Sequence, residues 1–380
     1  MRCDHACAHC GSRAARPRPD ELATSELFEV AAALIGLGTR EVTFIGGEAY
    51  LHPELLALVT FMAAAGVRVT MQTGGRGLTP ALARRLKAAG MAAVGVSIDG
   101  PEDVHDTLRA SRGSFKAAIA ALHAARDAGM LTTSNIQINR LSYRRLRETL
   151  DALLPTGIVG WRAQLTAPMG RAADEPDWIL EPWQILEVID TLAALQLEQV
   201  RLATAAGRPA RRALNIGLGN NLGYYGPHEQ VLRSIPGGVA AHWQGCMAGE
   251  YGIGIESDGS VKGCPSLPSA PYVGGNVRDL SLSDIWENVE VMRFTQTRGV
   301  EELWGFCGTC MYAEVCMGGC SFTAHTTLGR RGNNPFCYYR AATLKKRGRR
   351  ERLVQRELAA GEPYDFGRFE ILEEDWPAGG

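Results

Sequence analysis

The eight residues "CDHACAHC", at positions 3–10, decide how the rest of the chain is interpreted. They place cysteines at positions 3, 7 and 10, with no fourth cysteine nearby. A structural zinc site takes four ligands, whereas three thiolates around one centre leave a position open. Iron–sulfur clusters are held by cysteine thiolates. Three thiolates at this spacing can converge on three irons of a cubane. A small molecule with an amine and a carboxylate could then chelate the fourth iron.

Length and composition set the class of protein. The chain has 380 residues, of which 46% are hydrophobic, so we expect two or three domains with a buried core. A net charge of −1 argues against a protein built mainly to hold nucleic acid. No apolar signal segment is visible, and the longest apolar run, Leu55–Val67, is too short to span a bilayer. We therefore expect a cytoplasmic protein without a membrane partner, in which ten cysteines serve metal binding or catalysis.

Residues 20–205 alternate between β-rich runs and Ala/Leu-rich segments with helical spacing, which predicts βα units and a parallel sheet. The β-rich runs are "REVTFIGG" (40–47), "GVRVTMQT" (66–73), "AAVGVSID" (92–99), "NIQIN" (135–139) and "WRAQLTA" (161–167). Thr79 before Pro80 predicts a helix start, and Gly90 predicts its end. Five such strands, with a sixth at or before the first cysteines, would make an incomplete βα barrel.

The second half of the chain differs from the first in amino-acid composition. Residues 206–245 are rich in Gly and Asn, and we expect a linker or loop there. Residues 246–340 are dominated by cysteine and glycine, which predicts a segment held together by metal rather than by a large apolar core. Residues 341–380 contain the basic run "KKRGRRER" (345–352) and an acidic end, and we expect a charged tail.

At this point a resemblance adds to the spacing argument. "CDHACAHC" resembles the cluster motif of the radical S-adenosylmethionine (SAM) superfamily. The resemblance implies that SAM chelates the unique iron of a [4Fe–4S] cluster on Cys3, Cys7 and Cys10. It also implies that the reduced cluster cleaves SAM to methionine and a 5′-deoxyadenosyl radical, which abstracts a hydrogen atom. His9 stands where the family usually has an aromatic residue near the adenine. The alternative is a zinc knuckle with a distant fourth ligand.

The segment "FIGGEAYLHP" (44–53) supports this resemblance. It places Gly46, Gly47 and Glu48 directly after a predicted strand, where βα barrels gather their active sites. Glycine lets the backbone approach a ligand closely, and a carboxylate can receive an ammonium. The segment resembles the family's GGE motif, which holds the SAM amine. The alternative is a tight turn with a solvated glutamate.

Two further strand ends resemble the family. "MQTGG" (71–75) resembles its T-N-G strand end and makes Thr73 a candidate SAM contact, although Gly74 replaces the usual Asn. "SIDGPEDVHDTLR" (97–109) resembles its S-x-D-G segment, which implies a SAM contact at Ser97 and a turn-holding role for Asp99.

Other candidates rest on single residues. Gln164 could face the cofactor or pack in the core, and Arg112 could meet the SAM carboxylate or be an ordinary exposed loop residue. Only Met1 and Arg2 precede the motif, whereas the family usually has a strand upstream. We therefore expect either a trimmed start or a missing first strand. A missing strand would leave the barrel edge beside the cluster exposed.

The remaining seven cysteines form a second set. Cys246 and Cys264 follow the pattern C-x12-G-x4-C, and "CGTCMYAEVCMGGC" (307–320) supplies four more before Cys337. The set resembles the SPASM domain, which binds two auxiliary [4Fe–4S] clusters, so the resemblance implies three clusters in all. The alternative is a pair of zinc sites.

The resemblance also implies how the seven thiolates divide. It assigns Cys307, Cys310, Cys316 and Cys337 to the far cluster, and Cys246, Cys264 and Cys320 to the cluster nearer the active site. Some relatives complete the near cluster with an extra cysteine just upstream, but "GGVAAHWQG" (237–245) supplies none. His242 or a substrate thiol or amide could fill the open position.

The family resemblance also limits the function. SPASM proteins mostly modify peptides, and Pro265 stands where sulfatase-maturing members commonly have an aspartate. The lead hypothesis is oxidative modification of a ribosomally made precursor peptide, with flavodoxin or ferredoxin as electron donor. The alternatives are oxidation or rearrangement of a small metabolite, and a non-catalytic metal-bound scaffold. "LGNNLGYYGPHEQ" (218–230) is either a flexible substrate lip or an interdomain linker.

Overall fold

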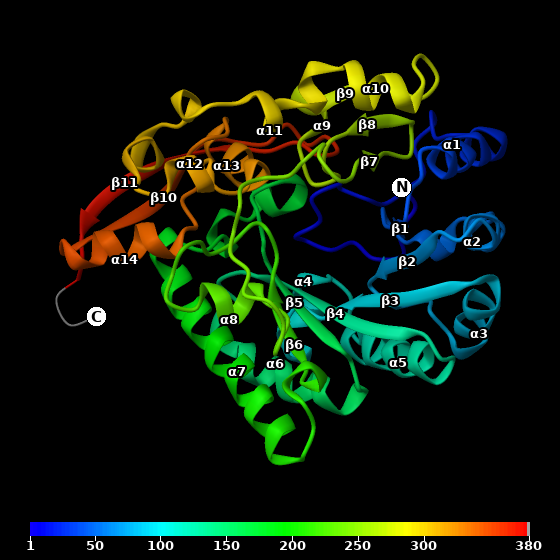
Figure 1. Ribbon diagram of the computed structural model, residues 1–380, viewed down its shortest axis with the longest axis horizontal. Coiled ribbons are helices and arrows are strands. Elements are labelled where there is room, and N and C mark those ends of the chain that lie inside the picture. Colours follow the sequence, from blue (N-terminus) through cyan, green and yellow to red (C-terminus); the bar gives the residue numbers. More distant parts are fainter. Residues whose placement is uncertain (378–380) are drawn as a thin grey trace.

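The first half of the chain forms a six-stranded parallel sheet. The computed structural model describes residues 1–377 (Figure 1). The strands pair in chain order from β1 to β6, each parallel to the next. Their bounds are β1 Glu41–Phe44, β2 Arg68–Thr73, β3 Met91–Ser97, β4 Leu131–Ile138, β5 Gly160–Leu165 and β6 Asn215–Leu218. The predicted α/β architecture, a partial (β/α)6 barrel, is confirmed.

The sixth strand lies elsewhere than we expected. It is β6, inside the segment 206–245 that the sequence predicted to be a linker. The residues around the first cysteines form no strand, only an isolated bridge between Arg2 and Ala15. The side chain of Gln196 accepts the amide of Ile216 and donates to the carbonyl of Leu214, so a helix side chain helps to hold this short strand.

Helices cover the outer face of the sheet. They are α1 Thr24–Gly36, α2 Leu55–Ala64, α3 Pro80–Ala89, α4 Glu102–Leu108, α5 Ser114–Asp127, α6 Leu146–Leu153, α7 Ile185–Ala205 and α8 Glu229–Arg233. The predicted boundaries of α3 are confirmed, because Thr79 accepts the amide of Leu82 and Gly90 ends the helix in the left-handed conformation. Figure 1 shows α3, α5 and α7 along the outside of the sheet.

Burial alternates along the strands. On β4 the side chains of Ile136 and Ile138 are buried against the helices, whereas Asn135 and Gln137 between them are half-buried on the opposite face. A period of two is what a strand with one apolar and one polar face requires. The sheet therefore has an apolar outer face under the helices and a polar inner face.

The cysteine-rich half is built from short elements. Its strands are β7 Gly254–Ile255, β8 Ser260–Lys262 and β9 Val273–Asn276, which form an antiparallel sheet. Its helices are α9 Ser269–Tyr272, α10 Leu282–Asn288, α11 Phe294–Thr297, α12 Ala313–Cys316 and α13 Ser321–Leu328. The apolar residues here gather in small separate clusters, in contrast to the single large cluster under the barrel helices.

Of the segment 341–380 expected as a charged tail, residues 341–375 are folded, and residues 378–380 lie outside the described part of the chain. The folded part continues helix α14 (Tyr338–Lys346) and forms an antiparallel hairpin of β10 (Arg349–Glu357) and β11 (Arg368–Asp375). The basic side chains of one strand pair with the acidic side chains of the other, as in Arg350–Glu374 and Arg356–Glu370. Opposite charges across an antiparallel pair stabilise it.

The loop of this hairpin reaches the cysteine motif. The Arg13 guanidinium donates to Asp365 at 2.8 Å and also pairs with Asp174. The amide of Gly170 donates to the carbonyl of Asp365 at 2.8 Å. The hairpin loop therefore lies against the N-terminal cysteine loop.

Within the described residues 1–377, none of the helices is long and apolar enough to cross a membrane.

Candidate active site

The loop that carries Cys3, Cys7 and Cys10 is fixed by backbone contacts from three directions. The amide of Glu48, just beyond β1, donates to the carbonyl of Arg2 at 2.9 Å. A Cβ at Gly47 would lie only 2.1 Å from the same carbonyl oxygen, so this approach requires glycine. From α4 the carbonyl of Leu108 accepts the amide of Ala8, and Arg171 donates to the carbonyl of Cys7 at 2.6 Å.

The three thiols face one another. Burial, with smaller contributions from the neighbouring Glu48, Cys7 and Cys10, raises the pKa of Cys3 to about 12. Burial also raises the pKa of Cys7, although the charge of Arg109 opposes this. Thiols that raise each other's pKa lie close together, and a bound cation would be needed to keep all three as thiolates. The loop therefore offers the donor set of a metal cluster.

Glu48 lies beside this donor set and is buried. Ligand atoms of Cys3, Asp4 and Glu48 all lie within 4.8 Å of one another. The Glu48 carboxylate accepts the hydroxyl of Thr73 and the amide of Gly74, the latter at 2.6 Å. Burial raises the pKa of Glu48 to about 7, despite these two donors. The end of β1 and the end of β2 are thus joined through one carboxylate that a positively charged ligand would stabilise.

Two side chains here have buried polar atoms without partners in the described chain. They are both ring nitrogens of His5 and one carboxylate oxygen of Asp4. A Cβ at Gly74 would lie 2.9 Å from His5 Nε2, so the imidazole lies where a side chain at position 74 would begin. Unpaired buried polar atoms next to a carboxylate and three thiols fit a polar ligand such as SAM. The sequence interpretation missed His5, and the signal was the departure at Gly74.

Asp99 links the cysteine loop to the sheet. It is fully buried and accepts Arg109 Nε at 2.8 Å and the amide of Gln137 at 3.0 Å. His9 Nε2 lies 3.2 Å from the same carboxylate. Burial alone would raise the pKa of Asp99, but Arg109 and His9 hold it well below its usual range. Asp99 therefore connects β3, β4 and the cysteine loop.

Arg109 was not among the candidate residues, although it closes the quoted segment 97–109. Its guanidinium is buried and donates to Cys7 Sγ at 3.7 Å, as well as to Asp99. Arg112, which we considered instead, is exposed. Sequence position alone could not show which of these two arginines lies in the site. Arg109 lies there because it pairs with the buried carboxylate of Asp99.

Ser97 and Gln164 both lie on the inner face of the sheet. Ser97 ends β3 in register with Asn135, and Gln164 on β5 accepts Gln137 Nε2 at 3.1 Å. Neither packs in the apolar core. The candidate contacts Glu48, Thr73 and Ser97 thus lie at the carboxyl ends of three adjacent strands, β1 to β3.

The other seven thiols fall into two groups. Burial raises the pKa of Cys320 to about 12, and its thiol neighbours are Cys246 and Cys264. Burial likewise raises the pKa of Cys316 to about 12, with Cys307 and Cys310 as its thiol neighbours. Cys337 has Cys316 and Cys307 as its thiol neighbours. The fold thus brings Cys246 and Cys264 near Cys320, and Cys307, Cys310 and Cys337 near Cys316. The assignment of these two groups to a near and a far cluster stays a prediction.

The surroundings of His242 do not mark it as a ligand of the near group. It is exposed, whereas the next residue, Trp243, is buried and donates to the carbonyl of Cys316 at 3.2 Å. Tyr272 lies near the same group, because the charges of Cys246 and Cys320 contribute to raising its pKa. Its hydroxyl lies 2.9 Å from His325 Nδ1.

Tyr364, in the hairpin loop, lies near residues of both halves of the chain. The charge of Cys10 is among the influences that raise the pKa of Tyr364. The ammonium of Lys262, whose charge neighbours include Cys264, lies 4.2 Å from the centre of the Tyr364 ring. The hairpin loop therefore contacts the cysteine-rich half through Lys262 as well as the N-terminal cysteine loop through Arg13.

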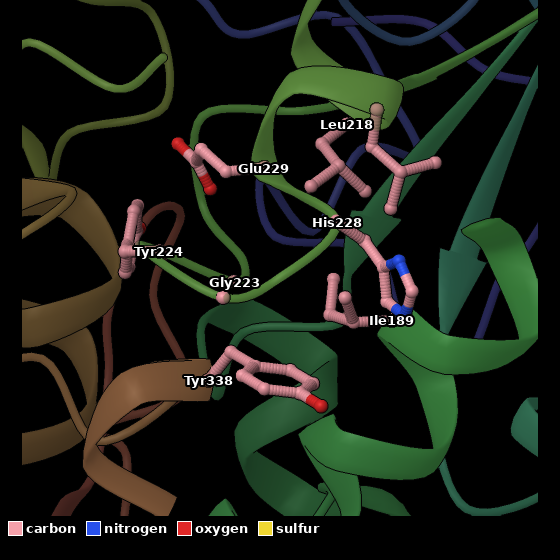
Figure 2. Close-up of a pocket in the computed structure, with 9 residues that line it drawn as sticks. Ile189, Leu218, Gly223, Tyr224, His228, Glu229 and Tyr338 are labelled. Carbon is pink, nitrogen blue, oxygen red and sulfur yellow. The ribbon is translucent and has the colours of Figure 1, made fainter. Parts of the chain in front are cut away.

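A crevice beside α7, α8 and α14 is too narrow for a water molecule and has no thiol in its lining. Figure 2 shows it between Ile189, Gly223 and Tyr338. The hydroxyl of Tyr338 donates to Asp190 at 2.9 Å, so this crevice is a packing seam between α14 and α7.

Comparisons with known proteins agree with this geometry. The family model of the radical SAM superfamily matches residues 1–153, and that of the SPASM iron–sulfur cluster-binding domain matches residues 246–311. The chain is 28% identical over 343 residues to the AdoMet-dependent heme synthase of Methanosarcina barkeri, covering 89% of this chain and 94% of that protein. It is 29% identical over 339 residues to the mycofactocin maturase MftC of Mycobacterium ulcerans, covering 88% and 85%.

Solved structures share the fold. The structure of anSMEcpe with bound AdoMet superposes with a TM-score of 0.67 at 16% identity and covers 90% of this chain and 92% of that chain. Streptococcus suis SuiB bound to the precursor peptide SuiA gives a TM-score of 0.59 at 15% identity, covering 85% and 70%. The chain therefore carries a radical SAM domain over residues 1–153 and a SPASM domain, which is an iron–sulfur cluster-binding domain, over residues 246–311.

Proposed function

We propose that this chain binds three [4Fe–4S] clusters, cleaves SAM reductively and abstracts a hydrogen atom from a peptide substrate. Cys3, Cys7 and Cys10 would hold the SAM-binding cluster, and the two other thiol groups would hold the auxiliary clusters. Bound at these sites, cluster and SAM supply a 5′-deoxyadenosyl radical as the hydrogen-abstracting agent. One electron from a donor such as flavodoxin or ferredoxin breaks the C–S bond of SAM and leaves methionine.

The observation that carries the proposal is the pocket around Glu48. The carboxylate lies within 4.8 Å of Cys3 Sγ, and the unpartnered nitrogens of His5 are buried beside it. Glu48 would bind the SAM ammonium, Thr73 and the amide of Gly74 would orient that carboxylate, and Ser97 is a further SAM contact at the next strand end. Gly46 and Gly47 would let the backbone approach the ligand.

We expect the near thiol group to have a role of its own in the reaction. An oxidative outcome requires one electron and one proton to leave the substrate after the hydrogen atom, and Cys246, Cys264 and Cys320 would hold the cluster that accepts the electron. We expect Cys320→Ala to abolish product while 5′-deoxyadenosine still forms. Loss of both activities in a variant that keeps its N-terminal cluster would contradict this division of roles.

The test of the proposal is metal analysis followed by SAM cleavage. Anaerobically reconstituted protein is expected to hold about twelve irons with labile sulfide. With dithionite it should release 5′-deoxyadenosine from SAM. Zinc without labile sulfide, or an iron-loaded protein that leaves SAM intact, would refute it.

Two substrate classes have support. The relatives named mycofactocin maturase favour a peptide. The relatives named heme synthase and Fe-coproporphyrin III synthase favour a small molecule, a tetrapyrrole. Release of 5′-deoxyadenosine should rise above its substrate-free rate with one class only. Short peptides encoded beside the gene and iron-coproporphyrin III are the two probes. A cytoplasmic location also stays a prediction.

A further inference from the structure

The inner face of the barrel sheet is lined mostly by side-chain amides, and these amides pair with one another. Asn135 donates to Gln72, whose side chain crosses the strand β3 at Gly95. Gln137 donates to Gln164. These amide side chains therefore take up part of one another's hydrogen-bonding capacity on the inner face.

Arg162 breaks this pattern. It lies on β5 in register with Asn135 on one side and Gly217 on the other. Its neighbours Trp161 and Ala163 point into the outer core, so the guanidinium belongs to the inner face. Within the described residues it forms no hydrogen bond or ion pair with another side chain or carbonyl. The residue is exposed to solvent.

The surroundings of Arg162 carry no compensating anion. Surrounding protein atoms and the charge of Arg233 both lower the pKa of Arg162, and no carboxylate acts on it. Arg233 itself is anchored to Glu229 and to the carbonyls of residues 219, 222 and 223. Gly217 leaves the position next to Arg162 without a side chain. The inner face therefore has an unpaired cation with free space beside it.

A guanidinium forms two parallel charge-assisted hydrogen bonds with a carboxylate, and this geometry makes arginine the preferred residue for that group. We propose that Arg162 binds a carboxylate of the substrate on the inner face of the sheet. The proposal rests on the function proposed above and narrows the substrate to a carboxylic acid.

The carboxylate of SAM is less well placed for Arg162. The SAM contacts proposed above, Glu48, Thr73 and Ser97, lie at the ends of β1, β2 and β3, whereas Arg162 is on β5. Two strand spacings, roughly 10 Å, separate its strand from that of Ser97. Arg162 therefore faces the half of the barrel that the SAM candidates leave open.

The carboxylate has two possible sources, and matched probes separate them. A fluorescent decapeptide without acidic side chains, compared with its C-terminal amide, tests a peptide terminus. Iron-coproporphyrin III, compared with its tetramethyl ester, tests a small carboxylic acid. Each pair is titrated into anaerobic, SAM-loaded holoenzyme. The variants are Arg162→Gln and Arg162→Lys, with Arg84→Gln as control because Arg84 is exposed on the outer helix α3.

We expect wild type to bind the free acid of one pair roughly ten- to a hundredfold more tightly than the blocked form. Arg162→Gln should erase that difference, Arg162→Lys should keep part of it, and Arg84→Gln should keep all of it. The affinity for SAM, measured by equilibrium dialysis, should not change. If Arg162→Gln loses iron, Arg162→Lys serves in its place. It keeps the positive charge without the two parallel donors of the guanidinium, so it should still show a reduced preference for the free acid.

Three results would overturn the assignment. They are an undiminished preference for the acid in Arg162→Gln, a fall in SAM affinity by the same factor, and a wild type that prefers neither acid. Failure of the proposed function has a separate signature. In that case wild type releases no 5′-deoxyadenosine, whatever the titrations show.

Discussion

The two halves of this molecule reach a stable fold by different means. The barrel half buries one large apolar cluster between its sheet and its helices. The cysteine-rich half has clusters of three or four buried residues each, and its strands are two to four residues long. Such small cores contribute little free energy of folding, whereas metal binding to a site that exists only in the folded state contributes its binding energy directly. We therefore expect folding to depend on metal mainly in the cysteine-rich half, in addition to the redox role proposed for its near thiol group.

Removal of iron should have the largest effect, and only on one side of this comparison. We expect chelation to leave β2–β5 protected in amide hydrogen exchange while residues 246–340 lose most of their protection, because their thiols stabilise the fold only with metal bound. Equal loss of protection in both halves would show that the barrel depends on metal as well.

Replacing Cys3, Cys7 and Cys10 together by Ala should abolish 5′-deoxyadenosine formation and remove about four irons per chain. The thermal midpoint should change little, since the loop lies outside the large apolar cluster. Iron analysis and calorimetry of the triple variant check both statements. A variant that lost all its iron would place the cysteine loop among the folding determinants of the second half.

Glu48→Ala should weaken SAM binding roughly ten- to a hundredfold, because it removes a charge-assisted contact worth about 1.5–3 kcal/mol. Equilibrium dialysis of the reconstituted protein measures this directly. Glu29→Ala, at an exposed position of α1, is the matched control and should bind SAM normally. Normal binding by Glu48→Ala would move the ammonium site away from the end of β1.

The smallest effect concerns the contact between the hairpin loop and the cysteine loop. Asp365→Asn removes the charge that faces Arg13 and should cost about 1–2 kcal/mol, seen as faster amide exchange in both loops. Glu370→Gln breaks an exposed pair in the same hairpin and should cost less than about 1 kcal/mol. Equal effects of the two changes would mean that the contact with Arg13 adds nothing specific.

The barrel strands could be predicted because their β-branched residues recur with the right period and glycines end the helices between them. Strand β6 was missed because "NIGL" is short and rich in Gly and Asn. What makes it a strand is tertiary: pairing with β5 and the side chain of Gln196. The hairpin of β10 and β11 was missed for a related reason. Each charged run is polar alone, and only pairing brings Arg350 opposite Glu374.

The candidate site divides in the same way. Cysteine spacing and the strand-end motifs identified residues that the fold brings together, such as Cys3 and Glu48. His5 and Arg109 depend on which side chains enter the space around Gly74 and Asp99, and linear spacing does not contain that information. Arg162 could not be recognised either, because the lack of a carboxylate partner for an arginine in a strand becomes visible only in the folded structure.

The contact between Arg13 and Asp365 also has a consequence in time. The two residues are 352 positions apart. At 5–20 residues per second, a ribosome would need roughly 20–70 s to pass from one to the other. Throughout that interval the three thiols of the cysteine loop are already synthesised while the residues that press against their loop are not. We therefore expect cluster insertion into this loop to be a late event, one that a scaffold protein performs on the released chain rather than on the nascent one.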